Sequence, residues 1–332
     1  LRLAYLDILK FVAIFMVVWG HMLGIFVEDG EFVVARNFIE GVNMPLFFAI
    51  SGYFLVKPIR DMNIGKIARI ILRYVYPVIV VSLVFSLCRL AVASPVECIA
   101  YGVVVFKSYW FVWSLVLCIL IAFVVSVIAH KTSKAIGVLC GLAFFTALMI
   151  PTASTISIRT VHFIPFFFVG CILGGGHCGF RKLGMQCALC YLLIAVFAGN
   201  LRKNGLSYYA NDFIWFTVVK SPSVVAFEIG RVFIGLLGIF GFVTMCKLLT
   251  EKWPGIGLLS FLGTTTLGVY LLHWPLIPYL TRIATSIGAI GGGAFMKLMY
   301  VTIFSIVVFA VCHCVTYYTM KFRLTRRFLW ML

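Results

Sequence analysis

Three ionisable residues lie within the first apolar stretch of the sequence. Asp7, Lys10 and His21 are separated by offsets of 3 and 11 residues. In an α-helix these offsets project all three side chains from nearly the same face, with Lys10 and His21 about 16 Å apart along the axis. A histidine exchanges protons near neutral pH, so His21 has the chemistry of a general base or of a transient acyl carrier. The alternative is a histidine that only hydrogen-bonds between helices, but the shared polar stripe favours a function, because ionisable groups in lipid are costly.

A second group of basic residues begins the third apolar stretch. Arg69 and Arg73 are four residues apart and share a helical face, and Lys66 precedes them. Forked hydrogen bonds from two guanidinium groups could hold the phosphates of a nucleotide-bearing donor. Ordinary snorkelling of basic side chains at the membrane surface also explains them, and these residues alone favour that explanation.

Other polar features give weaker signals. Glu228 and Arg231 are three residues apart and could pair with each other or shape an acceptor site. His273 lies two residues before Pro275, which opens a helix and frees backbone groups. Trp110 begins an apolar stretch, where it could belong to an interfacial aromatic belt or stack on a sugar ring.

The elements that must carry these residues follow from composition. The 332 residues are 63% hydrophobic and 11% charged, with a mean hydropathy of +1.13. This leaves too little polar surface for a water-soluble globule, so the chain must be solvated by lipid. A spanning helix needs about 20 mostly apolar residues. We expect an all-α integral membrane protein, a single domain over 1–332, with about ten transmembrane helices in one bundle near 8–27, 38–56, 69–92, 110–129, 135–150, 162–175, 184–199, 229–248, 260–281 and 296–320.

The distribution of lysine and arginine predicts the orientation. Most of these residues outside the spans fall on the side of the N-terminus, whereas acidic residues gather around the first loop on the other side. This bias predicts that both termini are cytoplasmic. Basic cytoplasmic loops facing anionic lipid explain the net charge of +17 without a nucleic-acid partner. No small-residue cleavage pattern follows the first apolar stretch, so we expect it to remain as a span.

Two further groups of residues carry little chemical signal. Cys187 and Cys190 form a C-x-x-C pair with no matching second pair, so no metal site is predicted. The remaining histidines are expected to be packing, interfacial or loop residues, and they are His130, His162, His177 and His313. The longest loop is expected at 200–228.

Six motifs occur in order along nearly the whole chain. The first is Asp7-Ile8-Leu9-Lys10, with a gap of ten residues before His21. The others are Asn43–Phe48 with Ile50–Phe54; Arg69, Arg73 and Pro77; Tyr109–Phe111; Arg159 with Pro165–Phe167 and Gly170; and Leu262–Gly263 with Tyr270–His273 and Pro275. Together they resemble the acyltransferase-3 family of bacterial membrane acyltransferases, particularly its glycan O-acetylases. Here Lys10 stands where many members have arginine, which keeps the charge but not the bidentate geometry.

This resemblance implies transfer of an acyl group, usually acetyl, across a bacterial cytoplasmic (inner) membrane. Acyl-CoA would dock from the cytoplasm, and the acceptor would be a hydroxyl of a cell-surface or lipid-linked glycan at the outer face. The resemblance implies that His21 is general base or acyl relay, while Asp7 and Lys10 orient the site or contact the donor. The expected donor-binding residues are Lys66, Arg69 and Arg73, and the expected acceptor-side residues are Trp110, Arg159, Glu228, Arg231 and His273.

Two other classes of protein are weighed against this interpretation. A glycan exporter or other secondary transporter is expected to carry acids near mid-bilayer, or broken helices in paired positions of two halves. The sequence shows neither. A structural membrane subunit would leave Lys10 and His21 unexplained. The acceptor sugar, the acyl chain and the oligomeric state, a homo-oligomer included, stay open.

Overall fold

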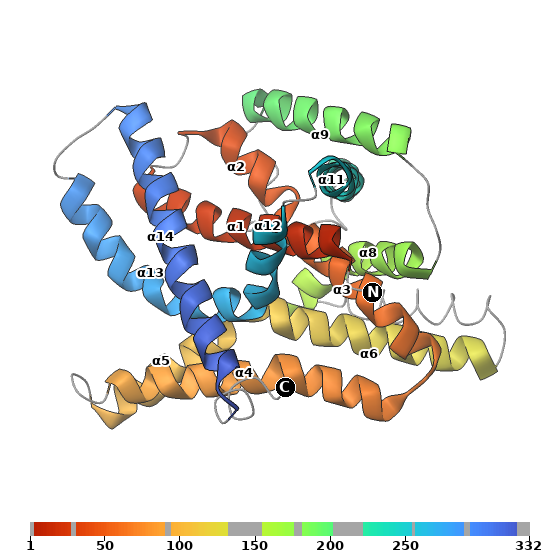
Figure 1. The fold of residues 1–332 in the computed structure, drawn as a ribbon, viewed down its shortest axis with the longest axis horizontal. Coiled ribbons are helices and arrows are strands. Elements are labelled where there is room, and N and C mark those ends of the chain that lie inside the picture. The colour runs from red at the N-terminus through yellow and green to blue at the C-terminus, as the bar shows by residue number, and fades with distance from the viewer. Residues whose placement is uncertain are drawn as a thin grey trace.

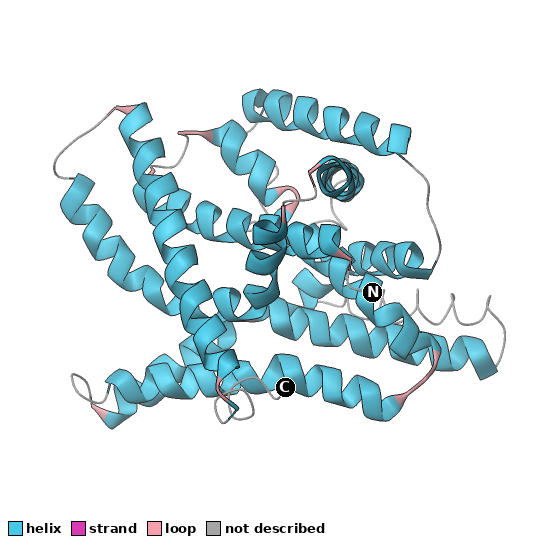
Figure 2. Ribbon diagram, in the orientation of Figure 1, coloured by secondary structure: helices cyan, strands magenta, loops and turns pink. Residues whose placement is uncertain are grey.

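The computed structural model describes residues 3–27, 31–89, 94–131, 155–175, 181–201, 222–253, 256–288 and 293–323. Within these ranges the chain forms helices and no strand, which confirms the all-α class (Figure 2). The helices are α1 (Ala4–Phe26), α2 (Val33–Glu40), α3 (Asn43–Arg60), α4 (Ile64–Cys88), α5 (Pro95–Ser108), α6 (Trp110–Lys131), α8 (Thr155–Gly175), α9 (Arg181–Leu201), α11 (Pro222–Lys252), α12 (Gly257–Leu262), the 3₁₀ turn η2 (Gly263–Thr265), α13 (Thr266–Gly288) and α14 (Ala294–Lys321).

Six helical segments in the described residues are long and apolar enough to cross a membrane. They are Ala4–Phe26, Val33–Arg60, Ile64–Cys88, Trp110–Ile128, Gly230–Lys252 and Ala294–Lys321. Helices α8 and α9 contain shorter apolar stretches, and α13 is not among the six. The predicted span 135–150 lies outside the described residues. The protein is therefore a multi-pass membrane protein, and the count of ten spans stays a prediction.

Two predicted spans differ from the helices that form. The span predicted at 38–56 begins inside α2, and the chain turns at Gly41 and Val42 before α3 begins. The span predicted at 260–281 covers parts of α12, η2 and α13 rather than one continuous helix. In both places the apolar character of the whole stretch hides the turn, because hydropathy reports burial in lipid and not the direction of the backbone.

Helix α5 lies in a stretch that we expected to be a loop. Ser94 and Glu97 form a capping box: the Ser94 backbone N–H donates to Glu97 Oε2 at 2.8 Å, and Glu97 N–H donates to Ser94 Oγ at 3.4 Å. Hydrogen bonds from the Ser94 backbone and side chain lower the pKa of the Glu97 carboxyl. Pro95 at the first helical position completes this start signal. The sequence Ser94-Pro95-x-Glu97 therefore contained the signal that hydropathy missed.

Helix α1 is the centre of the bundle. It contacts α2, α3, α11, α12, α13 and α14. In Figure 1 it lies between the group α4, α5 and α6 along one edge and α9 at the opposite edge. The polar residues of α1 consequently project among other helices and not only into lipid.

Close helix pairs depend on glycine. A methyl group added at Gly170 would overlap the Ala49 carbonyl, and one added at Gly52 would overlap the Phe167 carbonyl. Gly170 and Gly174 form a G-x-x-x-G pair on α8 facing α3, the pattern that lets membrane helices approach closely. Gly263 plays the same part between η2 and α1, against the backbone of Asp7.

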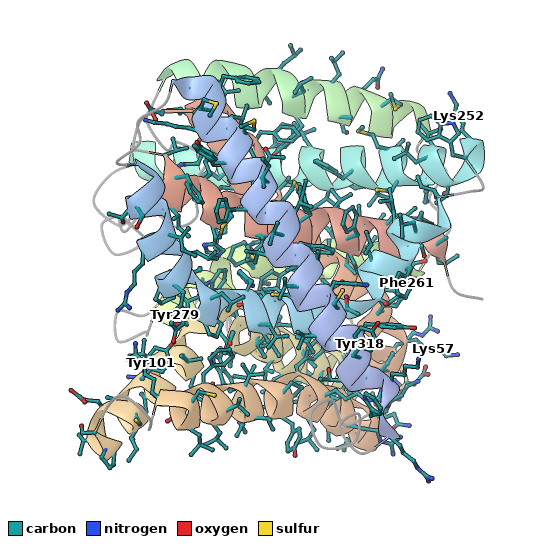
Figure 3. The ribbon with its side chains drawn as sticks, turned by 60° about the vertical axis from the view of Figure 1, so that its left-hand side comes forward. Lys57, Tyr101, Lys252, Phe261, Tyr279 and Tyr318 are labelled. Atoms are coloured by element: carbon teal, nitrogen blue, oxygen red, sulfur yellow. The ribbon has the colours of Figure 1, made fainter. Side chains whose placement is uncertain are left out.

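The two ends of the bundle carry different residues. Figure 3 shows Lys57, Lys252 and Phe261 toward one end, and Tyr101 and Tyr279 toward the other. Lys57 and Lys252 were both predicted to be cytoplasmic, and they do lie toward the same end. Which end faces the cytoplasm stays a prediction from the charge bias.

Replacing Gly170 with alanine is expected to destabilise the protein by roughly 1–3 kcal/mol, because the added methyl group forces α3 and α8 apart. Gly24→Ala is the matched control, since nothing lies within 4 Å of its added methyl group. Thermal unfolding in detergent should give a lower midpoint for Gly170→Ala and an unchanged or higher midpoint for Gly24→Ala. Equal midpoints would contradict the tight α3–α8 contact.

Candidate active site

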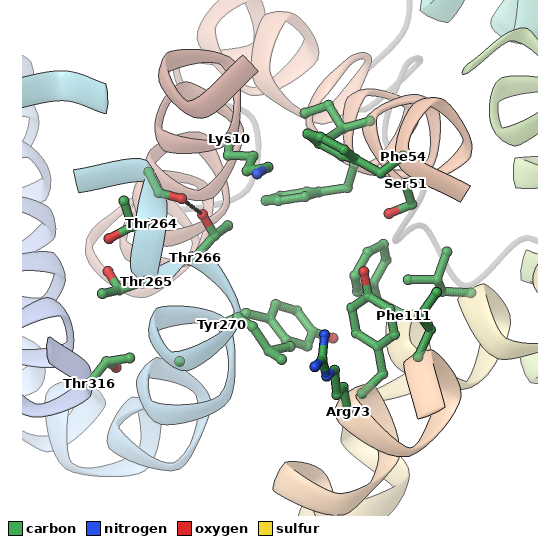
Figure 4. A pocket seen from close by; sticks show the side chains of 18 of the residues that line it. Lys10, Ser51, Phe54, Arg73, Phe111, Thr264, Thr265, Thr266, Tyr270 and Thr316 are labelled. Atoms are coloured by element: carbon green, nitrogen blue, oxygen red, sulfur yellow. Dashed lines mark hydrogen bonds between the residues drawn. The ribbon is translucent and has the colours of Figure 1, made fainter. Parts of the chain in front are cut away.

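A cavity of about 420 Å³ opens among α1, α3, α4, α6, α13 and α14 (Figure 4). Lys10 and Arg73 line it, together with five serine and threonine side chains, two tyrosines and an apolar remainder. The serine and threonine residues are Ser51, Thr264, Thr265, Thr266 and Thr316, and the tyrosines are Tyr74 and Tyr270. No acidic side chain is among the described residues that line the cavity. Such a cavity suits a ligand with negative charge and an apolar or amide-bearing arm.

Asp7 holds Lys10 in place at this cavity. Lys10 Nζ donates to Asp7 Oδ1 at 3.1 Å and lies 4.5 Å from the centre of the Phe54 ring. The Asp7 side chain is buried, and its backbone is pressed against Gly263 of η2. Two residues of the predicted stripe on α1, Asp7 and Lys10, therefore form an ion pair, and the ammonium group of this pair reaches the cavity.

Of the three predicted donor-binding residues, only one lines the cavity. Arg73 lines the cavity, and its guanidinium group lies beside Tyr270 in Figure 4. Lys66 and Arg69 lie earlier on α4, are exposed, and do not line the cavity. The spacing of four residues gave Arg69 and Arg73 one face, and both side chains are exposed, but only Arg73 borders the cavity.

His21 meets a second histidine. The ring centres of His21 and His273 are 5.3 Å apart, and the Trp274 ring lies 5.3 Å from His21 at an angle of 67°. The Tyr270 ring, 5.9 Å from His273, also lines the cavity. Tyr270 therefore links the cavity, which Lys10 also lines, to His273 of the histidine pair.

A hydrogen bond from Tyr109, which lies between α5 and α6, supports the segment that carries His273. Pro275 has no N–H, so the Leu271 carbonyl four residues earlier loses its helical donor. The buried Tyr109 hydroxyl donates to that carbonyl at 2.6 Å. His273 Nδ1 in turn donates to the Val269 carbonyl at 3.0 Å. The opened helix is therefore held in one conformation around the histidine pair.

The other predicted acceptor-side residues gather elsewhere. The Arg159 guanidinium group lies 4.5 Å from the centre of the Trp110 ring. Trp110 stacks on Phe163 with ring centres 5.7 Å apart. Arg231 is buried on α11, one turn before Gly235, which contacts Pro45 and Phe166. The side chain of Glu228 lies outside the described residues.

Comparison with protein families identifies the family of the chain. A family model described as an acyltransferase domain, Acyl_transf_3, matches residues 3–317. The chain belongs to the acyltransferase-3 family. No curated protein and no solved structure shows a significant match to the chain. Membership in this family supports a membrane acyltransferase activity. It does not identify the donor, the acceptor or the roles of the residues.

Several residues of this acyltransferase-3 protein were missed as site residues. Tyr109 and Tyr270 lie within recognised motifs, but nothing in the sequence shows that one supports His273 and the other lines the cavity. His313, expected to be a packing residue, is hydrogen-bonded through Nδ1 to Thr265 Oγ1 at 2.6 Å and so helps to order the cavity wall. The run Thr264-Thr265-Thr266 was the visible signal, since consecutive hydroxyls are unusual in an otherwise apolar stretch.

Replacing Tyr109 with phenylalanine is expected to cost roughly 1–3 kcal/mol of stability, because the buried Leu271 carbonyl loses its donor. Tyr279→Phe is the matched control, since Tyr279 is 53% exposed on the same helix as Leu271. Thermal unfolding of both variants in detergent checks the prediction. A midpoint for Tyr109→Phe equal to that of Tyr279→Phe would show that the hydrogen bond does not support α13.

Proposed function

We propose that this protein transfers an acyl group, acetyl in the simplest case, from cytoplasmic acyl-CoA to a glycan hydroxyl at the outer face of a bacterial inner membrane. The observation that supports the proposal is the cavity lined by Lys10, Arg73 and Tyr270, together with the contact between Tyr270 and His273 of the histidine pair. A charged donor would bind at the two cations, and its acyl group would react near the tyrosine that contacts this pair.

The lining of the cavity fits the donor. CoA carries several phosphate charges and cannot cross lipid by itself, so its charged part must bind near the membrane surface. Lys10 and Arg73 supply the matching charge, and the exposed Lys66 and Arg69 extend the basic face of α4 toward the nucleotide. The hydroxyl and apolar walls suit the amide-bearing arm and a short acyl chain.

His21 performs the chemistry in one of two ways. As a general base it takes the proton of the acceptor hydroxyl while that oxygen bonds to the thioester carbon, the C–S bond breaks, and the CoA thiolate then receives the proton from His21. As a relay, a His21 nitrogen first displaces the thiolate, and the hydroxyl then displaces the imidazole. Both routes consume one thioester and one hydroxyl and yield one ester and free CoA.

The acceptor is proposed to bind at Trp110 and Arg159, which contact each other. Trp110 and Arg159 offer an aromatic face and a guanidinium group, a combination that stacks on sugar rings and hydrogen-bonds their hydroxyls. Arg231 adds a buried charge on α11. A cell-surface or lipid-linked glycan fits this chemistry.

Two variants separate donor binding from catalysis. Arg73→Ala should weaken acetyl-CoA binding roughly tenfold or more, because a charge-assisted hydrogen bond is lost. His21→Ala should bind acetyl-CoA normally but transfer acetyl groups roughly 10²- to 10⁴-fold more slowly. Calorimetry on purified protein and acetyl transfer in membrane vesicles check the two effects, with the exposed Arg282→Ala as control.

The contrary outcomes are distinct. If the folded wild type binds neither acetyl-CoA nor longer acyl-CoAs, the enzyme proposal fails and the transporter becomes the better explanation. If His21→Ala transfers at the wild-type rate, the protein is still an acyltransferase but His21 is neither base nor relay.

A further inference from the structure

The hydrogen bonds of His273 define which of its ring nitrogens can accept. Nδ1 lies 3.0 Å from the Val269 carbonyl oxygen, and a carbonyl can only accept a hydrogen bond. Nδ1 therefore carries the proton. In the neutral ring, Nε2 is then the nitrogen with the lone pair.

Nε2 of His273 is a hydrogen-bond acceptor without a donor among the described residues. The side chain is 1% exposed, and Nε2 has no hydrogen-bond partner in the part of the chain that the structure describes. Buried polar atoms nearly always have a partner, so this nitrogen is open to a donor that lies within reach.

His21 is positioned to be that donor. With ring centres 5.3 Å apart, facing nitrogens of the two imidazoles approach hydrogen-bonding distance, roughly 3 Å. The second side-chain torsion of histidine has a broad distribution, so His21 can turn an N–H toward His273 at little cost. Trp274 packs against the same ring and limits other orientations. Two consecutive residues of α13 thus hold His21 on two sides.

We propose that His273 is the positioning residue of His21. It accepts a hydrogen bond from one His21 nitrogen and so leaves the lone pair of the other nitrogen toward the substrates. This inference rests on the proposed function, in which His21 reacts with acyl-CoA and an acceptor hydroxyl. The sequence analysis expected His273 to be an acceptor-side residue. In this proposal it acts on His21 instead.

The arrangement serves both routes open to His21. When His21 takes the acceptor proton, its ring becomes a cation and its N–H donates a stronger hydrogen bond to His273 Nε2. The proton then passes to the departing CoA thiolate, so His273 gains no net proton. When His21 attacks the thioester instead, the same tautomer supplies the nucleophilic lone pair.

Two substitutions distinguish positioning from packing. The amide oxygen of His273→Gln can reach the place of Nε2 and accept a hydrogen bond, whereas the shorter side chain of His273→Asn reaches only the place of Nδ1. Release of CoA thiol from acetyl-CoA is measured in membrane vesicles that contain each variant. His130→Asn is the matched control, because His130 is exposed on α6.

We expect kcat to fall on the order of 100-fold in His273→Asn and to recover at least tenfold in His273→Gln. The KM for acetyl-CoA and the pH profile of the rate should be unchanged in His273→Gln, since His273 does not line the cavity and His21 remains the titrating group. A wild-type rate in His273→Asn overturns the proposal. Equal loss in both variants, with normal acetyl-CoA binding and thermal midpoint, also overturns it, because His273 would then be the base itself. Absence of thiol release by the wild type would instead count against the proposed function.

Discussion

Polar groups inside a lipid-solvated bundle must be satisfied by the protein, because lipid offers no hydrogen bonds. This constraint shapes the site at two places. Asp7 and Lys10 bring their charges into the bundle as a pair, and the pair presents an ammonium group to the cavity. Pro275 opens α13, and the Tyr109 hydroxyl replaces the missing donor to Leu271. At these two places a polar group that is expensive in lipid is thus compensated by a neighbouring group.

The two compensated places are coupled through α1 and α13. Gly263 allows η2 to approach the backbone of Asp7, and η2 leads directly into α13 with Tyr270 and His273. The same elements therefore carry Lys10 and Tyr270, which line the cavity, and His21 and His273, which lie beyond its lining. In the proposed function a donor bound at Lys10 would be aligned with His21, because both residues belong to α1.

Much of this arrangement could be predicted from helical periodicity and motifs. The α-helical repeat alone was enough to predict that Asp7, Lys10 and His21 share a face. The family resemblance depended on short motifs that occur in the same order along the chain. The contact between His21 and His273 could not be predicted, since the two residues are far apart in sequence and their meeting depends on how α1 and α13 pack. The difference between Arg69 and Arg73 likewise depends on which turn of α4 borders the cavity. Arg159 and Trp110 were named separately, and only the fold shows that they contact each other.

The central claim is that the cavity holds the acyl-bearing arm of CoA with its acyl end at the histidine pair. Cryo-electron microscopy of the protein with a non-hydrolysable thioether analogue of acetyl-CoA tests it most directly. We expect density for the arm between Lys10 and Tyr270, with the acyl end beside His21 and the phosphates toward the basic face of α4. An analogue bound elsewhere, with the cavity unoccupied, would contradict the assignment of this cavity as the donor site.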